Sequence, residues 1–105
     1  MKPIANLLLA AGFSAVAAGS VVADDLGPDR AIELVEQGTI KHFRDLNKIA
    51  TDLHPGATIV DTELEDEYGR FVYKLELRDS ADTEWEVAID ARSGAVLKNR
   101  QDNDD

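Results

Sequence analysis

The stretch RFVYKLELRDSADTEWEVAIDARSGAVLK, residues 70–98, alternates apolar and polar side chains in successive short runs. Strict alternation places the apolar side chains on one face of a β-strand and the polar ones on the other. The apolar positions of the first two runs are Phe71, Tyr73, Leu75 and Leu77, followed by Trp85, Val87 and Ile89. A shorter run from Ala95 to Lys98 follows. We therefore predict three strands joined by hairpins, each with one apolar face.

The same alternation begins upstream, at residues 58–65, and predicts a further strand. Its apolar side is Thr58, Val60, Thr62 and Leu64, with Asp61, Glu63 and Glu65 opposite. One apolar face per strand is typical of an antiparallel sheet that is covered on one side only.

Matching apolar sides predicts the register of the first hairpin. The pairs are Leu64 with Phe71, Thr62 with Tyr73, and Val60 with Leu75. On the exposed face this register sets Glu65 against Arg70 and Asp61 against Lys74. The second hairpin allows two registers, with Arg78 against Asp82 or against Glu84. Either one predicts a ladder of ion pairs that largely neutralises the exposed face.

Two helices are predicted before the sheet. Gly27-Pro28-Asp29 is typical of a helix start and Gly38 of a helix end. Thr39 is a candidate cap for a second helix, in which apolar residues recur at three- and four-residue steps. These residues are Ile40, Phe43, Leu46, Ala50 and Leu53, and His54-Pro55-Gly56 ends the helix. The predicted fold class is α+β, with two N-terminal helices packed on one face of a four-stranded antiparallel β-meander.

The two ends of the chain differ from this domain in composition. Residues 1–23 combine Lys2, an apolar run and a small-residue cleavage site, which indicates a signal peptide cleaved after Ala23. The mature chain, 10 basic against 21 acidic residues, would carry a charge of −11 and reside in the periplasm. Residues 24–99 form the predicted domain, and residues 100–105 are predicted to be an acidic disordered tail.

Asp90, Ser93 and Gly94 resemble a functional cluster, but a turn explains them. Asp90 can accept hydrogen bonds from its own turn, and Gly94 suits a left-handed backbone position. A turn requires each of these residue types except the intervening Arg92. We therefore predict a structural turn.

The segment ELEDEYGRFVYKLELRDSADTEWEVAIDARSGAVL, residues 63–97, resembles a PepSY domain. The likeness lies in an acidic strand, a Gly-containing hairpin, a VYxxxL strand and an ending of the form V-x-[IV]-D-A-x-[ST]-G-x-[VL]. The upstream EQGTIKHFRDLNKIATDLHPGA resembles the helical part of small periplasmic members, so the likeness covers about residues 27–99. One departure is Ala81-Asp82, where the family often has a glycine.

The resemblance implies a regulatory role. PepSY domains occur in propeptides of thermolysin-type metallopeptidases and in bacterial envelope proteins, and restraint of peptidases has been proposed for them. The family has no established catalytic residues to transfer to this chain.

Other chemistry finds little support in the sequence. The chain has no Cys, which excludes thiolate sites. His42 and His54 would lie about 18 Å apart along one helix, too far to share a metal.

Ser80 and Ser93 have no histidine nearby in the sequence, which argues against a serine hydrolase. The carboxylate pairs Glu63/Glu65 and Glu84/Glu86 are predicted to face solvent, which argues against acid–base catalysis. The end of the acidic tail, residues 102–105, lacks the loop of an EF-hand calcium site. Tyr73 and Trp85 fall on the apolar faces of the strands, so we expect them to pack in the core. We predict no catalytic residue, cofactor or metal ligand.

Two functions remain. The first is a non-enzymatic exported module that binds and modulates an envelope protein, such as a peptidase or a sensor kinase. The alternative is a periplasmic sensor of a small ligand or divalent cation that uses the acidic surface. The negative charge argues against nucleic acid, and no membrane insertion is expected after signal cleavage. The oligomeric state stays open.

Overall fold

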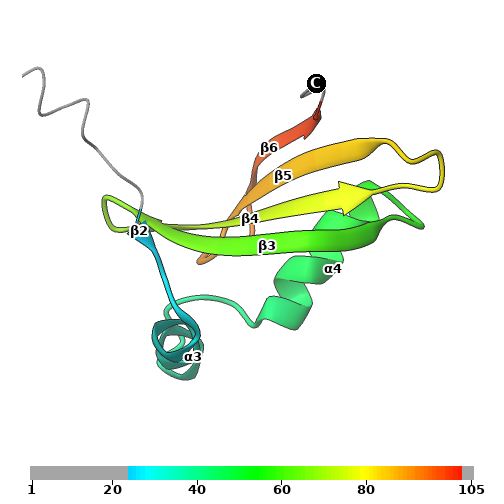
Figure 1. The fold of residues 1–105 in the computed structure, drawn as a ribbon. Helices are drawn as coiled ribbons and strands as arrows, with labels where there is room; N and C mark the ends of the chain where they lie inside the picture. The colour runs from blue at the N-terminus through cyan, green and yellow to red at the C-terminus, as the bar shows by residue number, and fades with distance from the viewer. Residues whose placement is uncertain (1–23, 103–105) are drawn as a thin grey trace, which may run out of the picture.

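A computed structural model of the chain describes residues 24–102 and has an α+β fold, with two helices on one side of an antiparallel sheet (Figure 1). The predicted class is therefore confirmed. In chain order the elements are β2 (Asp24–Asp25), α3 (Pro28–Glu36), α4 (Phe43–Leu53), β3 (Thr58–Glu67), β4 (Arg70–Arg78), β5 (Glu84–Asp90) and β6 (Val96–Gln101). The predicted signal peptide and the last three residues of the predicted tail lie outside the described residues.

The sheet has five strands in the order β2-β3-β4-β5-β6, so the predicted count of four was one too low. The additional strand is β2, in which Asp24 lies opposite Asp66 and Asp25 opposite Glu65. Two acidic residues carry no apolar alternation, and for this reason the pattern of the sequence did not reveal this strand.

Helix α3 begins with Pro28 in its first turn and ends in a Schellman motif. Gly38 takes the left-handed conformation, with φ of 75°. Its N–H donates to the carbonyl of Val35 at 3.0 Å, and the N–H of Thr39 donates to the carbonyl of Leu34 at 2.9 Å. Thr39 thus belongs to the end of α3.

Helix α4 begins at Phe43 with His42 as its N-cap, so the predicted cap at Thr39 is wrong. The residues between the helices are not helical, since His42 is extended and the N–H of Lys41 donates to the carbonyl of Ala91 at 2.9 Å. Ile40 is still buried, although it lies outside the helix. Within residues 24–102, no helix combines the length and the apolar character needed to cross a membrane.

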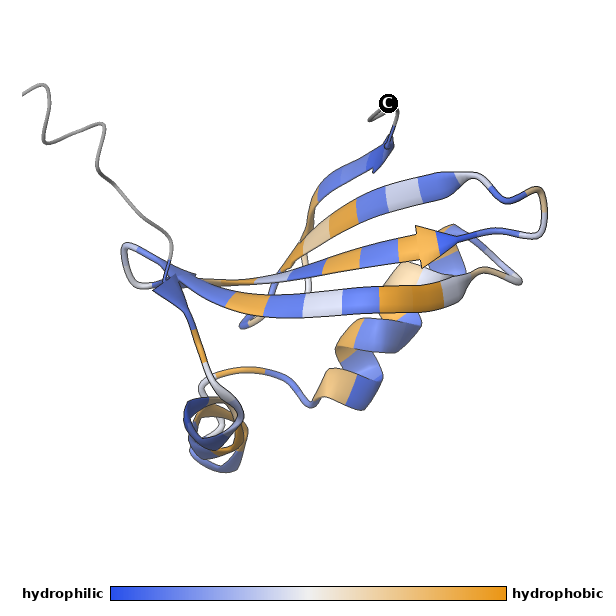
Figure 2. Cartoon of the chain, in the orientation of Figure 1, coloured by the Kyte–Doolittle hydropathy of each residue, from blue (hydrophilic) through white to orange (hydrophobic). Residues whose placement is uncertain are grey.

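The core lies between the helices and one face of the sheet, where apolar positions of the strands and of α4 meet (Figure 2). Its fully buried members include Leu34, Leu46, Leu75, Leu77, Val87 and Ile89. Tyr73 also belongs to the core, and its hydroxyl donates to Asn47 Oδ1 at 2.8 Å. Leu53, a position of the predicted apolar face of the second helix, is exposed instead, and so is Ile32 of α3.

The first hairpin is tighter than predicted, because its loop is the two residues Tyr68-Gly69. Glu67 pairs with Arg70, and Leu64 therefore lies opposite Tyr73 and not opposite Phe71. A bulge between Ile59 and Asp61 then reverses the predicted alternation. Ile59 packs against the core, whereas Val60 is 44% exposed.

The second hairpin sets Arg78 opposite Glu84, one of the two registers left open by the sequence. Asp79 organises its loop, since Oδ1 accepts hydrogen bonds from the N–H groups of Ala81 and Thr83, both at 2.9 Å. Asp82, at the place where the family often has a glycine, is left-handed with φ of 66°.

Strand β6 is longer than predicted and extends to Gln101. The N–H of Asp102 also donates to the carbonyl of Glu84 at 2.8 Å. Residues 100 and 101, which were predicted to belong to a disordered tail, therefore belong to the sheet. Pairing with β5 orders them, although their own side chains are polar.

Candidate functional site

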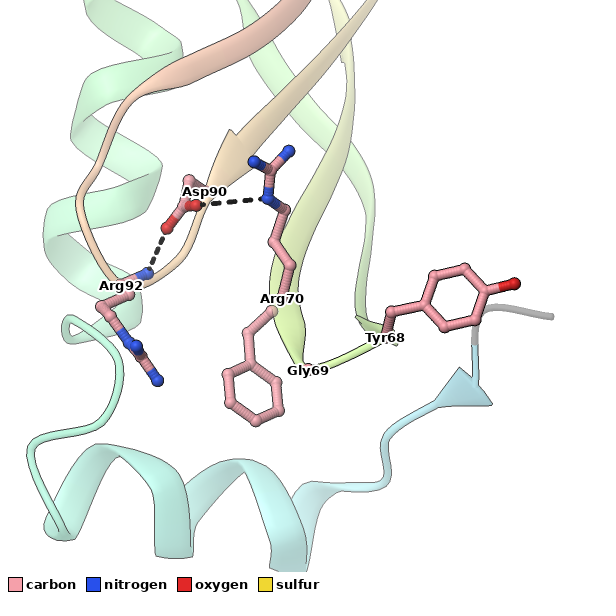
Figure 3. Close-up of a pocket in the computed structure, with 6 residues that line it drawn as sticks. Tyr68, Gly69, Arg70, Asp90 and Arg92 are labelled. Carbon is pink, nitrogen blue, oxygen red and sulfur yellow. Dashed lines mark hydrogen bonds and ion pairs between the residues drawn. The ribbon is translucent and has the colours of Figure 1, made fainter. Parts of the chain in front are cut away.

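Two turns at one end of the sheet enclose a cleft of about 270 Å³, which we call the hairpin-end cleft (Figure 3). One turn joins β3 to β4 and the other joins β5 to β6. Helix α3 runs past the same end (Figure 3). The residues that line the cleft are Tyr68, Gly69, Arg70, Phe71, Asp90 and Arg92.

The structure places Asp90, Ser93 and Gly94 together in the β5–β6 turn. Asp90 Oδ1 accepts hydrogen bonds from the N–H groups of Arg92 and Ser93, at 2.9 and 3.0 Å. The N–H of Gly94 donates to the Asp90 carbonyl at 2.7 Å, and the Ser93 hydroxyl accepts from the N–H of Ala95 at 3.2 Å. All these contacts are internal to the turn and fix its shape.

Gly94 also brings the turn against α4 and the residues before it. Its φ is 85°, a conformation that favours glycine. A Cβ atom at this position would lie 3.0 Å from Lys41 Cε and 3.3 Å from Ile49 Cδ1. The left-handed conformation therefore favours glycine here, and a Cβ would require the Lys41 and Ile49 side chains to move by a few tenths of an ångström.

The carboxylate of Asp90 is stabilised in its charged form. The N–H group of Ser93, first among several causes, lowers the pKa of Asp90, and the guanidinium of Arg70 contributes. Arg70 Nε lies 3.8 Å from Asp90 Oδ2 (Figure 3). Asp90 is thus an ordered anion inside the cleft, with its charge compensated by the turn and by one arginine.

The β3–β4 turn contributes an exposed aromatic ring. Tyr68 and Gly69 are both left-handed, with φ of 57° and 85°, as a two-residue hairpin of this kind requires. Asp66 Oδ1 accepts a hydrogen bond from the N–H of Gly69 at 2.7 Å. Tyr68 is 77% exposed and points away from the domain (Figure 3).

Neither Tyr68 nor Arg70 was a predicted site residue, and Arg70 was expected only in an ion pair with Glu65. The signal available was the Tyr-Gly pair between two alternating runs, because a two-residue loop with glycine is a strong hairpin indication. The predicted register, with Glu65 opposite Arg70, implied a longer loop. It therefore did not place Tyr68 at the tip of the hairpin.

A family model described as "PepSY: Peptidase propeptide and YPEB domain" matches residues 45–100 of the chain. The chain belongs to the PepSY family. Searches of the curated proteins and of the solved structures gave no match. The resemblance inferred from the sequence is therefore confirmed at the level of the family.

The PepSY match includes both turns of the hairpin-end cleft, and it extends from within α4 into β6. Helix α3 and strand β2 precede the matched residues. The cleft is therefore formed by the part of the chain that matches the family.

The face of the PepSY sheet away from the helices carries ion pairs, but not those predicted. Lys74 Nζ lies 2.8 Å from Glu65 Oε1 and 3.6 Å from Glu67 Oε2, and Arg70 contacts Asp90. The predicted pairs Glu65–Arg70 and Asp61–Lys74 are wrong, because the register differs by two residues.

Arg78 and two cations of β6 form further ion pairs on the sheet. Arg78 contacts both Asp82 and Glu84, the two alternatives that the sequence left open, at 3.4 and 2.6 Å. Lys98 and Arg100 both contact Glu86 Oε1, at 3.5 and 3.2 Å.

Three carboxylates gather where β2 meets β3. One oxygen each of Asp25, Glu63 and Glu65 lies within 4.8 Å of the others. The hydrogen bond from Glu63 to Glu65 raises the pKa of Glu63, and the negative charge of Asp25 adds to this effect. Glu65 is buried, and the Lys74 ammonium already supplies a positive charge beside it.

The remaining candidate residues lie apart from one another. His42 is the N-cap of α4, whereas His54 follows its C-terminus. The His54 ring stacks on Trp85 with 4.3 Å between centroids, and its Nε2 lies 2.7 Å from Asn99 Oδ1. Ser80 lies in the β4–β5 turn. The contacts of His54 connect the end of α4 to β5 and β6, so His54 has a structural role.

Proposed function

We propose that this PepSY domain is a non-enzymatic exported module that binds an envelope protein, either a peptidase or a signalling protein, and modulates its activity. Membership of a family described by peptidase propeptides supports a regulatory role. The observation that carries the proposal is Tyr68, which is 77% exposed on a left-handed backbone and borders a cleft with Arg70 and Arg92.

Tyr68 is an unfavourable choice for its turn. Asn, Asp and Gly are the residues preferred in such hairpins, and a left-handed conformation costs other residues about 1–2 kcal/mol. The ring gains no burial in return. Tyrosine and arginine are enriched among the residues that dominate binding energy in protein interfaces. Because strained backbone positions cluster at functional sites, we infer that Tyr68 contributes to binding.

Capture from an envelope extract tests the proposal. The mature domain is immobilised, and retained peptidases and signalling proteins are identified and assayed with and without the free domain. Tyr68→Ala should reduce capture of the specific partner at least tenfold while the melting temperature stays the same, because alanine meets the same left-handed backbone cost. Arg44→Ala, on an exposed position of α4, is the control and should retain binding. Equal capture by the Tyr68 variant would overturn the proposal.

Export is part of this proposal and has its own test. Intact-mass measurement of the protein from the periplasmic fraction should give a chain that starts at Asp24. A full-length product retained in the membrane would contradict the cleaved signal peptide.

The second candidate is a divalent-cation sensor, favoured by the group of Asp25, Glu63 and Glu65. Carboxylate oxygens are the ligands that Ca²⁺ prefers. Millimolar Ca²⁺ should then raise the melting temperature of the domain, and Glu63→Gln should abolish the rise. If Ca²⁺ leaves the melting temperature unchanged, this candidate is excluded.

A further inference from the structure

We propose that the hairpin-end cleft binds a single carboxylate of an extended protein segment through Arg92, with an apolar neighbour of that carboxylate packed against Phe71. This inference rests on the proposed function and specifies the partner chemistry of the same site.

Arg92 is the residue of its turn that the turn does not use. The hydrogen bond from residue 92 to Asp90 comes from the backbone N–H, so any residue except proline could make it. The guanidinium makes no ion pair within residues 24–102, and its side chain points away from the Asp90 carboxylate (Figure 3). Arg92 is exposed, so no packing requirement explains it either.

Asp90 does not form an ion pair with the Arg92 guanidinium, because both of its carboxylate oxygens already have partners. Oδ1 accepts two backbone N–H groups, and Oδ2 faces Arg70. The turn therefore fixes an arginine backbone at the rim of a cleft and leaves five guanidinium donors for an external acceptor.

The lining of the cleft defines the ligand. A guanidinium is a planar fork that matches a carboxylate with two parallel hydrogen bonds. Phe71 lines the same cleft and provides apolar surface, whereas the Tyr68 ring points away from the domain (Figure 3), and Gly69 adds no side chain to the cleft. A carboxylate with an apolar neighbour satisfies both parts of the site.

The net charge restricts the ligand to one carboxylate. The chain carries −10, so a run of acidic residues or a nucleic acid would be repelled over the whole surface. A lone carboxylate in an otherwise neutral segment meets mainly the local charge, since charges beyond about 8 Å are screened at physiological salt. The carboxylate belongs to an Asp or Glu side chain or to a chain terminus.

Peptide titration of the mature domain, observed by NMR, tests the inference. The probes are acetyl-Leu-Glu-Phe-amide, which carries a side-chain carboxylate, acetyl-Leu-Phe with a free C-terminal carboxylate, and the neutral acetyl-Leu-Gln-Phe-amide. One of the two carboxylate probes should bind at least tenfold more tightly than the neutral probe and shift the Arg92 Nε–H and Gly69 N–H signals. Whichever carboxylate probe binds identifies the source of the carboxylate.

Variants separate a binding role from a structural one. Arg92→Gln should reduce carboxylate binding at least tenfold without changing the melting temperature, and Arg92→Lys should restore only part of it. Arg44→Gln, an exposed arginine on α4, should bind like the unchanged chain. If the neutral probe binds as well as the carboxylate probes, or if Arg92→Gln binds normally, the inference is wrong. In that case loss of partner capture in Tyr68→Ala would still support the proposed function, so the two failures are distinguishable.

Discussion

Replacing Gly94 by valine should destabilise the domain for two separable reasons. The left-handed backbone, with φ of 85°, would cost a residue with a Cβ about 1–2 kcal/mol. The new side chain would also meet Lys41 and Ile49, at 3.0 and 3.3 Å from its first carbon, and overpacking of this kind costs about 1–3 kcal/mol. We expect Gly94→Val to lower the free energy of unfolding by about 2–5 kcal/mol in total.

Gly69 provides a matched control for the backbone contribution. Its φ is also 85°, but a Cβ there would have no atom within 4 Å. Gly69→Val should therefore cost only the conformational part, about 1–2 kcal/mol. Urea denaturation followed by circular dichroism measures both values, provided that the slope with denaturant is unchanged. Equal losses in the two variants would refute the close packing of the β5–β6 turn against Lys41 and Ile49.

Three further changes test other contacts of the fold. His54→Ala removes the stack on Trp85 and a hydrogen bond to β6, and thermal melting should show a loss of about 1–2 kcal/mol. Lys74→Glu places a like charge beside the buried Glu65, so urea denaturation should show a loss of about 1–3 kcal/mol, smaller in 1 M NaCl. Asp90 has a lowered pKa in the folded state, so its contribution to stability is present above its ordinary pKa of about 4 and is lost as the pH falls below it. The stability difference between the unchanged chain and Asp90→Asn should therefore shrink between pH 5 and pH 2, and a constant difference would contradict the stabilised carboxylate.

Alternation of side chains predicted the faces of the strands correctly outside the bulge in β3, but it predicted the wrong register for the first hairpin. A shift of two residues keeps every side chain on the same face, so Leu64 opposite Phe71 and Leu64 opposite Tyr73 both match apolar sides. Only the turn distinguishes the two registers, and the Tyr-Gly pair selected the tighter one despite the strain at Tyr68.

Features that depend on tertiary contacts could not be predicted from the pattern of apolar and polar residues. The bulge beside Val60 interrupts an alternation that runs without a break through the sequence. Thr39 has the residue type of an N-cap, yet its N–H closes α3, and the backbone of Lys41 pairs with Ala91 before α4 begins. Local preference was correct about the presence of two helices and wrong about the start of the second, because contacts with the sheet determine it.

The turn that forms one side of the candidate site was predictable from the sequence, but the side chains that line the cleft were not. The motif around Asp90 and Gly94 indicated a turn, and Arg92 was the one residue type in it that a turn does not require. The sequence alone does not bring Arg92 near Tyr68, since 24 positions separate them and only the pairing of β3, β4 and β5 unites the two turns.

The order of strands in the sheet has a consequence for how the chain folds. From β3 to β6 each strand pairs with the next one in the sequence, so these pairings need only short loop closures and give a low contact order. Strand β2 is the exception, because Asp25 reaches Glu65 across both helices. Closing that long loop for a two-residue strand gains little, so β2 should dock last during folding and detach first during partial unfolding. Amide exchange at the N-terminal end of the domain is thus expected to be fast, while the β4–β5 pairing at the centre of the sheet exchanges only with global unfolding.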